Sequence, residues 1–342
     1  MTVVVGHLPR PDGHGALDLG LRFARARGEP MLVVTVVPRQ WSTPSPARVD
    51  AEFGEYARRV GAEAAASAGA YLAAAGVDVP VSYRAVPGRS VASTLVEVVQ
   101  EAGGTVLVVG GTADAPPGRI GVGTTAQKLL HAAPVGVALA PRDRSPDSSP
   151  GSSPGSSPRG TPDGRPDSRA DSTVDGTVDR AVDSTVDGTV DRTAGFGRLT
   201  VAFSDSESSV RTVAATAELA ARLGVALRVA SFGVRNPTMY PPEVGLHAED
   251  SVLDSWADQA VEAQRRLVSG GIVGAGVPRV IGTGTSWDEA VAAVDWRGDE
   301  LLVVGSSDSG PLARVFLGSR ASKLIRAAPV PVLVLPHPSS RS

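Results

Sequence analysis

The residues best suited to ligand chemistry are a glycine followed by a hydroxyl residue, found twice, as Gly123-Thr124 and Gly318-Ser319. Each pair closes a long loop that leaves an apolar run at Gly110 or Gly305, and each is expected to begin a helix. The first turn of a helix offers free backbone N–H groups and the positive end of the dipole. The two loops are therefore predicted to bind an anion or a phosphate group.

Side chains inside the two loops add charge to these predicted sites. Arg119 and Arg314 are candidates for pairing with phosphate. Ala113 and Asp308 lie three residues after the strand-ending glycines, at equivalent positions. Asp308 would place a carboxylate beside the phosphates, which is unfavourable unless it faces away or shares a metal ion. The second site is therefore expected to need Mg²⁺ more than the first.

The elements that position these loops follow a regular alternation of short apolar runs and Ala-rich helical stretches. Strands are predicted at residues 2–5, 31–37, 79–86, 105–109 and 134–140, and again at 199–203, 226–232, 278–281, 301–304 and 331–335. In the first half, helices are predicted near 15–26, 49–75, 90–102 and 124–131. Continuous apolar strands separated by helices indicate a parallel sheet covered on both faces. The predicted fold class is α/β, with two doubly wound, Rossmann-like five-stranded domains in tandem.

The two halves align without gaps near their ends. The strand ending at Gly110 aligns with the strand ending at Gly305, and Arg119 aligns with Arg314. An Ala-Pro-Val triplet precedes the last strand in both halves. A constant offset over so many positions indicates an internal duplication.

The order strand, Gly-x2-Gly-x9-Gly-(Ser/Thr), helix, Ala-Pro-Val, strand resembles the universal stress protein family over both halves. The resemblance implies a regulatory protein that binds ATP or a related nucleotide, with Mg²⁺, and does not turn it over. The binding residues that it implies are Gly110, Ala113, Arg119, Gly123 and Thr124, with Gly305, Asp308, Arg314, Gly318 and Ser319 in the second half. In the family the last strand commonly forms the dimer contact.

The chain departs from the family pattern at several positions, and these departures favour an alternative function. Ala113 and Asp308 replace the second glycine, and Leu8 and Ser204 stand where the family often has Asp. The alternative is a stress-related interaction or scaffold protein whose loops bind no nucleotide. An enzyme is the least favoured reading, because no general base or metal constellation can be assembled from the residues.

Residues 143–196 separate the halves and are rich in Pro, Ser, Gly and Asp, with few large apolar side chains. Such a segment cannot offset its ordering entropy and is predicted to be a disordered tether. It divides the chain into domains at 1–142 and 197–337. The apolar last strands are predicted to pair, either within one chain as a pseudo-dimer or between two chains as a homodimer.

Composition narrows the remaining function classes. A net charge of −3 provides no basic field for nucleic acid or an acidic membrane, and there is no Cys. Without a leader segment or an apolar span, the protein is expected to be cytoplasmic. The five histidines show no metal-ligand spacing, and His7 and His14 are interpreted as exposed loop residues. Ser90 and Ser286 are predicted helix N-caps, and Trp287 is interpreted as a packing residue.

The predicted tether gives a direct test of the domain boundaries. Limited proteolysis of the intact chain should cut between Ser145 and Thr193 and leave two resistant fragments, because only that stretch lacks a predicted core. Mass spectrometry of the fragments identifies the cut sites. Protection of the whole stretch would show that the boundaries are misplaced.

Overall fold

The computed structural model describes residues 1–10, 13–39, 49–143, 195–235, 242–306 and 318–336 of the chain. The predicted tether lies outside these residues. In the first repeat the elements are β1 (Thr2–Gly6), α1 (Gly15–Arg27), β2 (Met31–Pro38), α2 (Val49–Ala74), β3 (Val81–Gly88), α3 (Val91–Glu101), β4 (Gly104–Gly110), α4 (Thr124–Ala132) and β5 (Gly136–Ala140).

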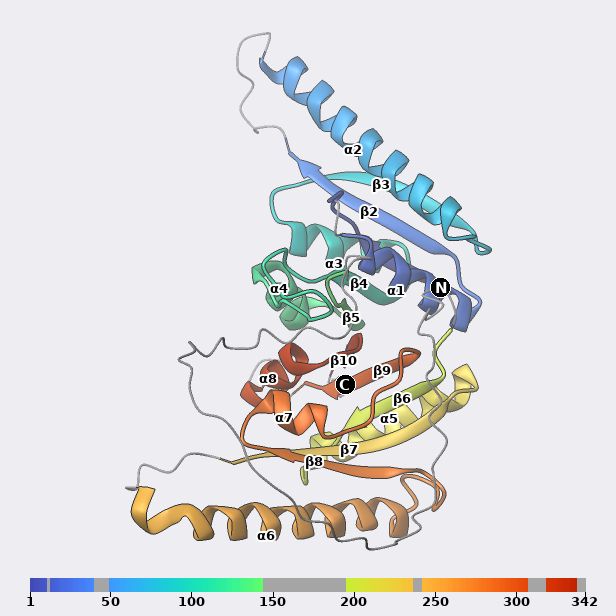
Figure 1. The fold of residues 1–342 in the computed structure, drawn as a ribbon. Helices are drawn as coiled ribbons and strands as arrows, with labels where there is room; N and C mark the ends of the chain where they lie inside the picture. Colours follow the sequence, from blue (N-terminus) through green and yellow to red (C-terminus); the bar gives the residue numbers. More distant parts are fainter. Residues whose placement is uncertain (11–12, 40–48, 144–194, 236–241, 307–317, 337–342) are drawn as a thin grey trace, which may run out of the picture. The chain divides into compact units, whose positions relative to one another are not determined.

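The second repeat follows the same order of helices and strands (Figure 1). Its elements are β6 (Arg198–Ala202), α5 (Glu207–Leu223), β7 (Ala226–Val234), α6 (Pro242–Ser269), β8 (Arg279–Gly284), α7 (Trp287–Ala292), β9 (Glu300–Gly305), α8 (Ser319–Ala327) and β10 (Val332–Leu335). The predicted α/β class with two tandem domains is confirmed.

The strands form one sheet in the order β3-β2-β1-β4-β5-β10-β9-β6-β7-β8. Neighbouring strands are parallel within each repeat, and the β5–β10 pair is antiparallel. In each repeat the strand order reverses between β1 and β4, or between β6 and β9. This reversal creates the switch point at which ligands bind in open α/β sheets.

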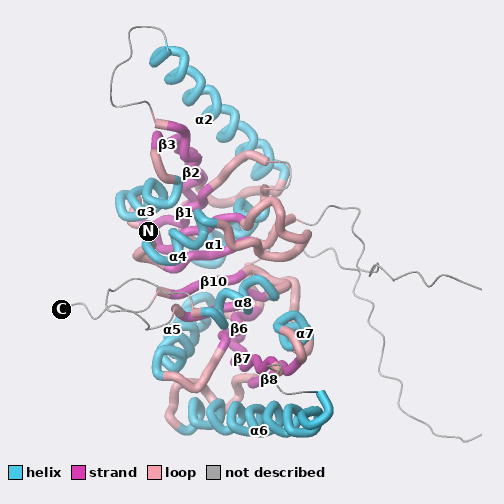
Figure 2. The backbone as a smooth tube through the Cα atoms, turned by 90° about the vertical axis from the view of Figure 1, so that its left-hand side faces the viewer, coloured by secondary structure: helices cyan, strands magenta, loops and turns pink. Residues whose placement is uncertain are grey.

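Helices cover both faces of the strands, as Figure 2 shows for β6, β7 and β8 between α5 and α7. Alternate residues of one strand serve the two layers: Val3 and Val5 of β1 pack with α1, whereas Val4 packs with α3. The central strands are therefore mostly apolar. Exceptions in the second repeat include Thr200, Arg228 and Glu300, whose buried side chains contact one another. The edge strand β3 differs, because Ser82 to Ala85 are exposed.

Local signals set several helix starts. Ser90 and Ser286 cap α3 and α7 by accepting hydrogen bonds from the backbone N–H groups of Ser93 and Glu289, as predicted. Ser206 caps α5 in the same way. None of the helices in the described part of the chain is long and apolar enough to cross a membrane.

The two repeats are joined by their last strands, within the chain. Leu139, Ala138 and Val137 of β5 pair with β10 residues Val332, Leu333 and Val334, respectively. The core continues across this joint, because Ala138 and Leu333 belong to one buried cluster. The edge strands β5 and β10 thus pair their backbone N–H and C=O groups with each other, so neither remains an exposed apolar edge.

We expect the joint to hold after the tether is cut. The two fragments should co-elute in size-exclusion chromatography, because backbone hydrogen bonds and buried apolar side chains connect them. Raising the salt concentration should leave them together, since apolar burial is not screened by ions. Elution as two separate species at low salt would contradict this description of the joint.

Candidate functional site

A cavity of about 370 Å³ lies at the carboxyl ends of β1 and β4 in the first repeat. Glycines line it where these strands end, at Gly6, Gly110 and Gly111. An added Cβ at Gly110 would meet only the Cβ of Ala16, at 3.9 Å, so a side chain there would extend into open space. The cavity has the size of a small-molecule site and reaches the strand backbone.

The N-terminus of α4 forms another wall of this cavity. Gly123 is the N-cap residue, so no side chain caps the helix, and Thr124, Thr125 and Ala126 line the cavity. The same holds for α8, whose N-cap is Gly318. Serine caps satisfy the first turns of α3, α5 and α7, whereas α4 and α8 leave this role open to an acceptor from outside the chain.

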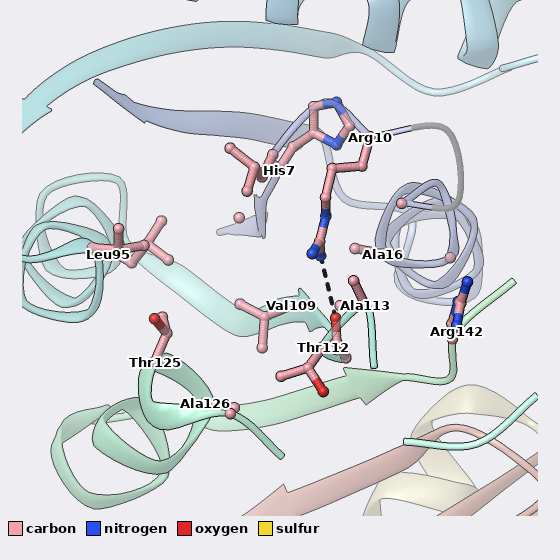
Figure 3. Close-up of a pocket in the computed structure, with 18 of the residues that line it drawn as sticks. His7, Arg10, Ala16, Leu95, Val109, Thr112, Ala113, Thr125, Ala126 and Arg142 are labelled. Carbon is pink, nitrogen blue, oxygen red and sulfur yellow. Dashed lines mark hydrogen bonds between the residues drawn. The ribbon is translucent and has the colours of Figure 1, made fainter. Parts of the chain in front are cut away.

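Two arginines bring positive charge to the first cavity. Figure 3 shows Arg10 reaching from the segment after β1 toward the β4–α4 loop, where its Nη2 donates to the Gly111 carbonyl at 3.3 Å. The Arg10 Nε is buried without a hydrogen-bond partner. Arg142, after β5, donates from Nη1 to the Ala115 carbonyl at 2.9 Å. Asp114 is the one carboxylate among the described residues that line the cavity, so cations outnumber anions there.

His7 also lines this cavity, and it is buried, with 4% of its surface exposed. The expectation that it is an exposed loop residue was wrong, because the chain turns back over the sheet directly after β1. Neither ring nitrogen has a hydrogen-bond partner. Burial, and to a lesser extent the charge of nearby His14, lowers the pKa of His7 from 6.5 to about 4. At neutral pH the ring is therefore an uncharged donor and acceptor.

The second repeat has a cavity at the corresponding place, of about 760 Å³. Gly305, Gly318 and Ser319, three of the predicted binding residues, line it. Aromatic side chains contribute to its walls, among them Trp287. Trp287 also packs against the core, as its interpretation as a packing residue predicts. It therefore has both a packing position and a place in the cavity wall.

The predicted site residues of the first loop separate into two groups. Gly110, Ala113, Gly123 and Thr124 line the first cavity. Arg119 does not line it: its guanidinium contacts the Ala327 carbonyl and the carboxylate of Asp288, 3.5 Å away, both in the second repeat. Its role in phosphate binding stays a prediction. Asp308 and Arg314 lie outside the described residues.

Each of the two repeats matches one known protein family. The model of the universal stress protein family matches residues 1–141 and 195–336. This chain belongs to the universal stress protein family. Universal stress protein Rv2319c of Mycobacterium tuberculosis (strain H37Rv) is 39% identical over 336 residues, covering 98% of this chain and all of that protein. Universal stress protein Mb2346c of Mycobacterium bovis shows the same identity and coverage.

Solved structures support the fold of this universal stress protein. PA1789 of Pseudomonas aeruginosa PAO1, described as functionally unknown, aligns with a TM-score of 0.50 at 14% identity, covering 98% of this chain and 92% of that one. A second structure, from P. aeruginosa UCBPP-PA14, has a TM-score of 0.51 at 13% identity with the same coverage. At such identities the likeness concerns the fold alone.

Sequence reasoning about the universal stress protein motif missed Arg10 and Arg142. Both follow strands of the first repeat, β1 and β5, at the carboxyl edge of the sheet. That position was the available signal, since binding residues gather there. In the part of the chain that the structure describes, no group of three His, Asp or Glu side chains could hold a metal ion.

The lowered pKa of His7 predicts a pH-dependent stability. Because the folded pKa lies below 6.5, the unfolded chain binds the proton more readily, and stability is lost as pH falls from 6.5 to about 4. His7→Phe, which introduces the residue of the equivalent position Phe203, should reduce this loss. Thermal unfolding of both proteins across this range measures it. Parallel pH profiles would contradict the buried, neutral state of His7.

Proposed function

We propose that the first repeat binds ATP or a related nucleotide and that the protein is a nucleotide-responsive regulator. The observation that carries the proposal is the meeting of Arg10 and Arg142 with the uncapped start of α4 around one cavity. Cations and free helix N–H groups are complementary to phosphate oxygens. Such a site in a stress protein would report nucleotide supply by changing its affinity for partners.

The parts of the cavity suggest how a nucleotide would lie. Phosphates would occupy the glycine-lined region beside Gly110 and the hydroxyl of Thr124, where no side chain blocks approach to the backbone. The base would lie toward the apolar side chains of Val34, Val36 and Leu95, which also line this cavity. An uncharged His7 would donate to or accept from a ring heteroatom.

The proposal includes no hydrolysis. Catalysis of phosphate transfer needs a group that orients the attacking water, and often a second cation near the transferred phosphate. Asp114, the one carboxylate among the described lining residues, is exposed. Mg²⁺ would accompany the nucleotide phosphates, and we assign it no ligand among the described residues. The proposal places the protein in the cytoplasm, where nucleotides are abundant.

The competing function is that of a stress-related scaffold with no nucleotide. The contacts of Arg119 favour it, because this arginine supports the joint between the repeats instead of lining the cavity. Ala113 adds a methyl group to the cavity wall at the second glycine position of the family motif. Binding measurements on the intact protein separate the two functions.

The sharpest test uses Gly110→Val. The structure leaves room for the new side chain only in the cavity, so folding should persist while nucleotide binding is blocked. Equilibrium dialysis with labelled ATP, with and without Mg²⁺, should show at least tenfold weaker binding, or about 1.4 kcal/mol. Thermal unfolding should change little.

Gly274→Val is the matched control, because an added Cβ at Gly274 has no neighbour within 4 Å and lies away from both cavities. This variant should bind ATP as the unmodified protein does. If the unmodified protein binds no ATP at any Mg²⁺ concentration, the scaffold function replaces this proposal.

A further inference from the structure

The second cavity differs from the first in the side chains of its walls. Among the described residues, four aromatic side chains line it: Phe203, Phe232, Trp256 and Trp287. The chain contains only 6 Phe, 4 Trp and 4 Tyr, so a large share of them is gathered at one place. The first cavity has no Phe, Trp or Tyr among its described lining residues.

Strand register shows that two of these aromatic residues occupy positions equivalent to non-aromatic residues of the first cavity. The backbone N–H of Phe203 donates to Ala230 as that of His7 donates to Val34, so Phe203 corresponds to His7. Two residues further along the second strand, Phe232 corresponds to Val36, and both members of this pair line their cavities. The two repeats thus share a backbone arrangement at these positions, with rings in the second repeat where the first has smaller or polar side chains.

The helical walls show the same exchange. Trp287 is the first residue of α7, directly after the Ser286 cap, as Val91 is the first residue of α3 after the Ser90 cap. Both line the cavity of their own repeat. Trp287 is half-buried and offers part of its ring surface to the cavity.

Trp256 of α6 is accommodated by a glycine in the facing strand. A Cβ added at Gly233 of β7 would overlap the six-membered ring of Trp256, so the indole lies directly against the strand backbone. In the first repeat, register places Val37 at the position of Gly233. A large ring could not lie against the strand at that position, so the Trp256 contact is specific to the second repeat. Gly233 alternates with Phe232 along β7, and Trp256 therefore covers the other face of the strand from Phe232 and Trp287.

Packing holds part of this wall in place before any ligand binds. The ring of Phe232 is stacked on Trp296, with 6.4 Å between centroids and 6° between planes. Trp296 is fixed in turn by a hydrogen bond from its indole N–H to the Val291 carbonyl, at 2.8 Å. A preorganised aromatic surface loses little conformational entropy on binding a flat molecule.

A buried polar atom faces the same cavity. Ser306 is 4% exposed, lines the cavity, and its Oγ has no hydrogen-bond partner. A hydroxyl that is buried without a partner costs free energy unless a ligand atom satisfies it. By contrast, Ser231 accepts a hydrogen bond from Nε2 of Gln264 at 2.9 Å.

Charge separates the two cavities further. The charged side chains among the described residues that line the second cavity are Arg320, which is exposed, and Asp205, which pairs with Arg266 at 2.8 Å. No pair of cations faces this cavity from the described residues as Arg10 and Arg142 face the first. From the described walls a phosphate chain would gain less electrostatic stabilisation than in the first cavity, because the positive groups there are the uncapped start of α8 and the exposed Arg320.

We propose that the second cavity binds an uncharged heteroaromatic molecule, held by stacking on Trp287 and Phe232 and by a hydrogen bond to Ser306. Stacking on aromatic side chains is tolerant of ring identity, so the site selects for a flat ring and against negative charge. This site goes beyond the nucleotide-binding function proposed for the first cavity and does not depend on it.

The test compares neutral and charged ring compounds on the full-length protein. Equilibrium dialysis with riboflavin, adenosine and ATP is carried out in the Gly110→Val background, where the first cavity is blocked. Riboflavin and adenosine should bind, and ATP should bind more weakly than adenosine. Ligand binding should also quench tryptophan emission, because Trp256 and Trp287 line the cavity.

Trp287→Val introduces the residue of the equivalent position Val91 and should weaken riboflavin and adenosine binding by about tenfold or more. Ser306→Ala, which removes one atom from a buried position, should weaken both by several-fold and keeps the test open if Trp287→Val folds poorly. ATP binding at the first cavity, measured with Gly110 intact, should be unchanged in both variants.

Three results would overturn the proposal. They are absence of binding by both neutral compounds, tighter binding of ATP than of adenosine with the first cavity blocked, and unchanged riboflavin affinity in both folded variants. ATP binding at the first cavity is measured separately, with Gly110 intact, so failure of the second site can be distinguished from failure of the first.

Discussion

The arrangement of the molecule depends on three residue pairs between β5 and β10. Each five-stranded sheet alone would expose an apolar edge strand with unpaired N–H and C=O groups. Antiparallel pairing satisfies both edges at once and makes one ten-stranded sheet. Because strands within each repeat are parallel, this pairing also directs the carboxyl ends of the two repeats to opposite edges of the sheet. The two cavities therefore open at opposite edges, and one small ligand cannot occupy both.

The contact between the repeats also involves the β4–α4 loop, which forms part of the first cavity. Arg119 leaves the β4–α4 loop and contacts the Ala327 carbonyl at the end of α8, where the negative end of a helix dipole favours a cation. The main chain around it is tied to the strand end, since the Arg142 N–H donates to the Arg119 carbonyl at 2.9 Å. The second repeat thus supports the loop that forms a wall of the first cavity.

Duplication gave both repeats the same backbone, and side chains then made the two sites different. The uncapped helix starts at Gly123 and Gly318 are common to both. Among the described lining residues, the first cavity has two arginines, whereas the second has four aromatic rings. This difference is physically consistent, because a phosphate needs charge and free N–H groups, while a neutral ring needs flat apolar surface.

The sequence by itself determined the α/β class, the duplication, the serine caps and the glycine-to-helix transitions. These features rest on local patterns: apolar runs, a constant offset between halves, and cap residues at helix starts. It also located the strand ends and helix starts that line both cavities, because these lie near each other in any doubly wound sheet.

Only the tertiary structure decided which side chains enter the cavities. Arg10, Arg142 and His7 come from segments distant in sequence, and the path of the chain after a strand decides whether they are buried or exposed. Arg119 belongs to the predicted motif, yet the neighbouring repeat provides its contacts. The position of Trp256 depends on Gly233 leaving room for its ring, a pairing between a helix and a strand that sequence spacing does not reveal. Long-range packing, not local pattern, sets the chemistry of each site.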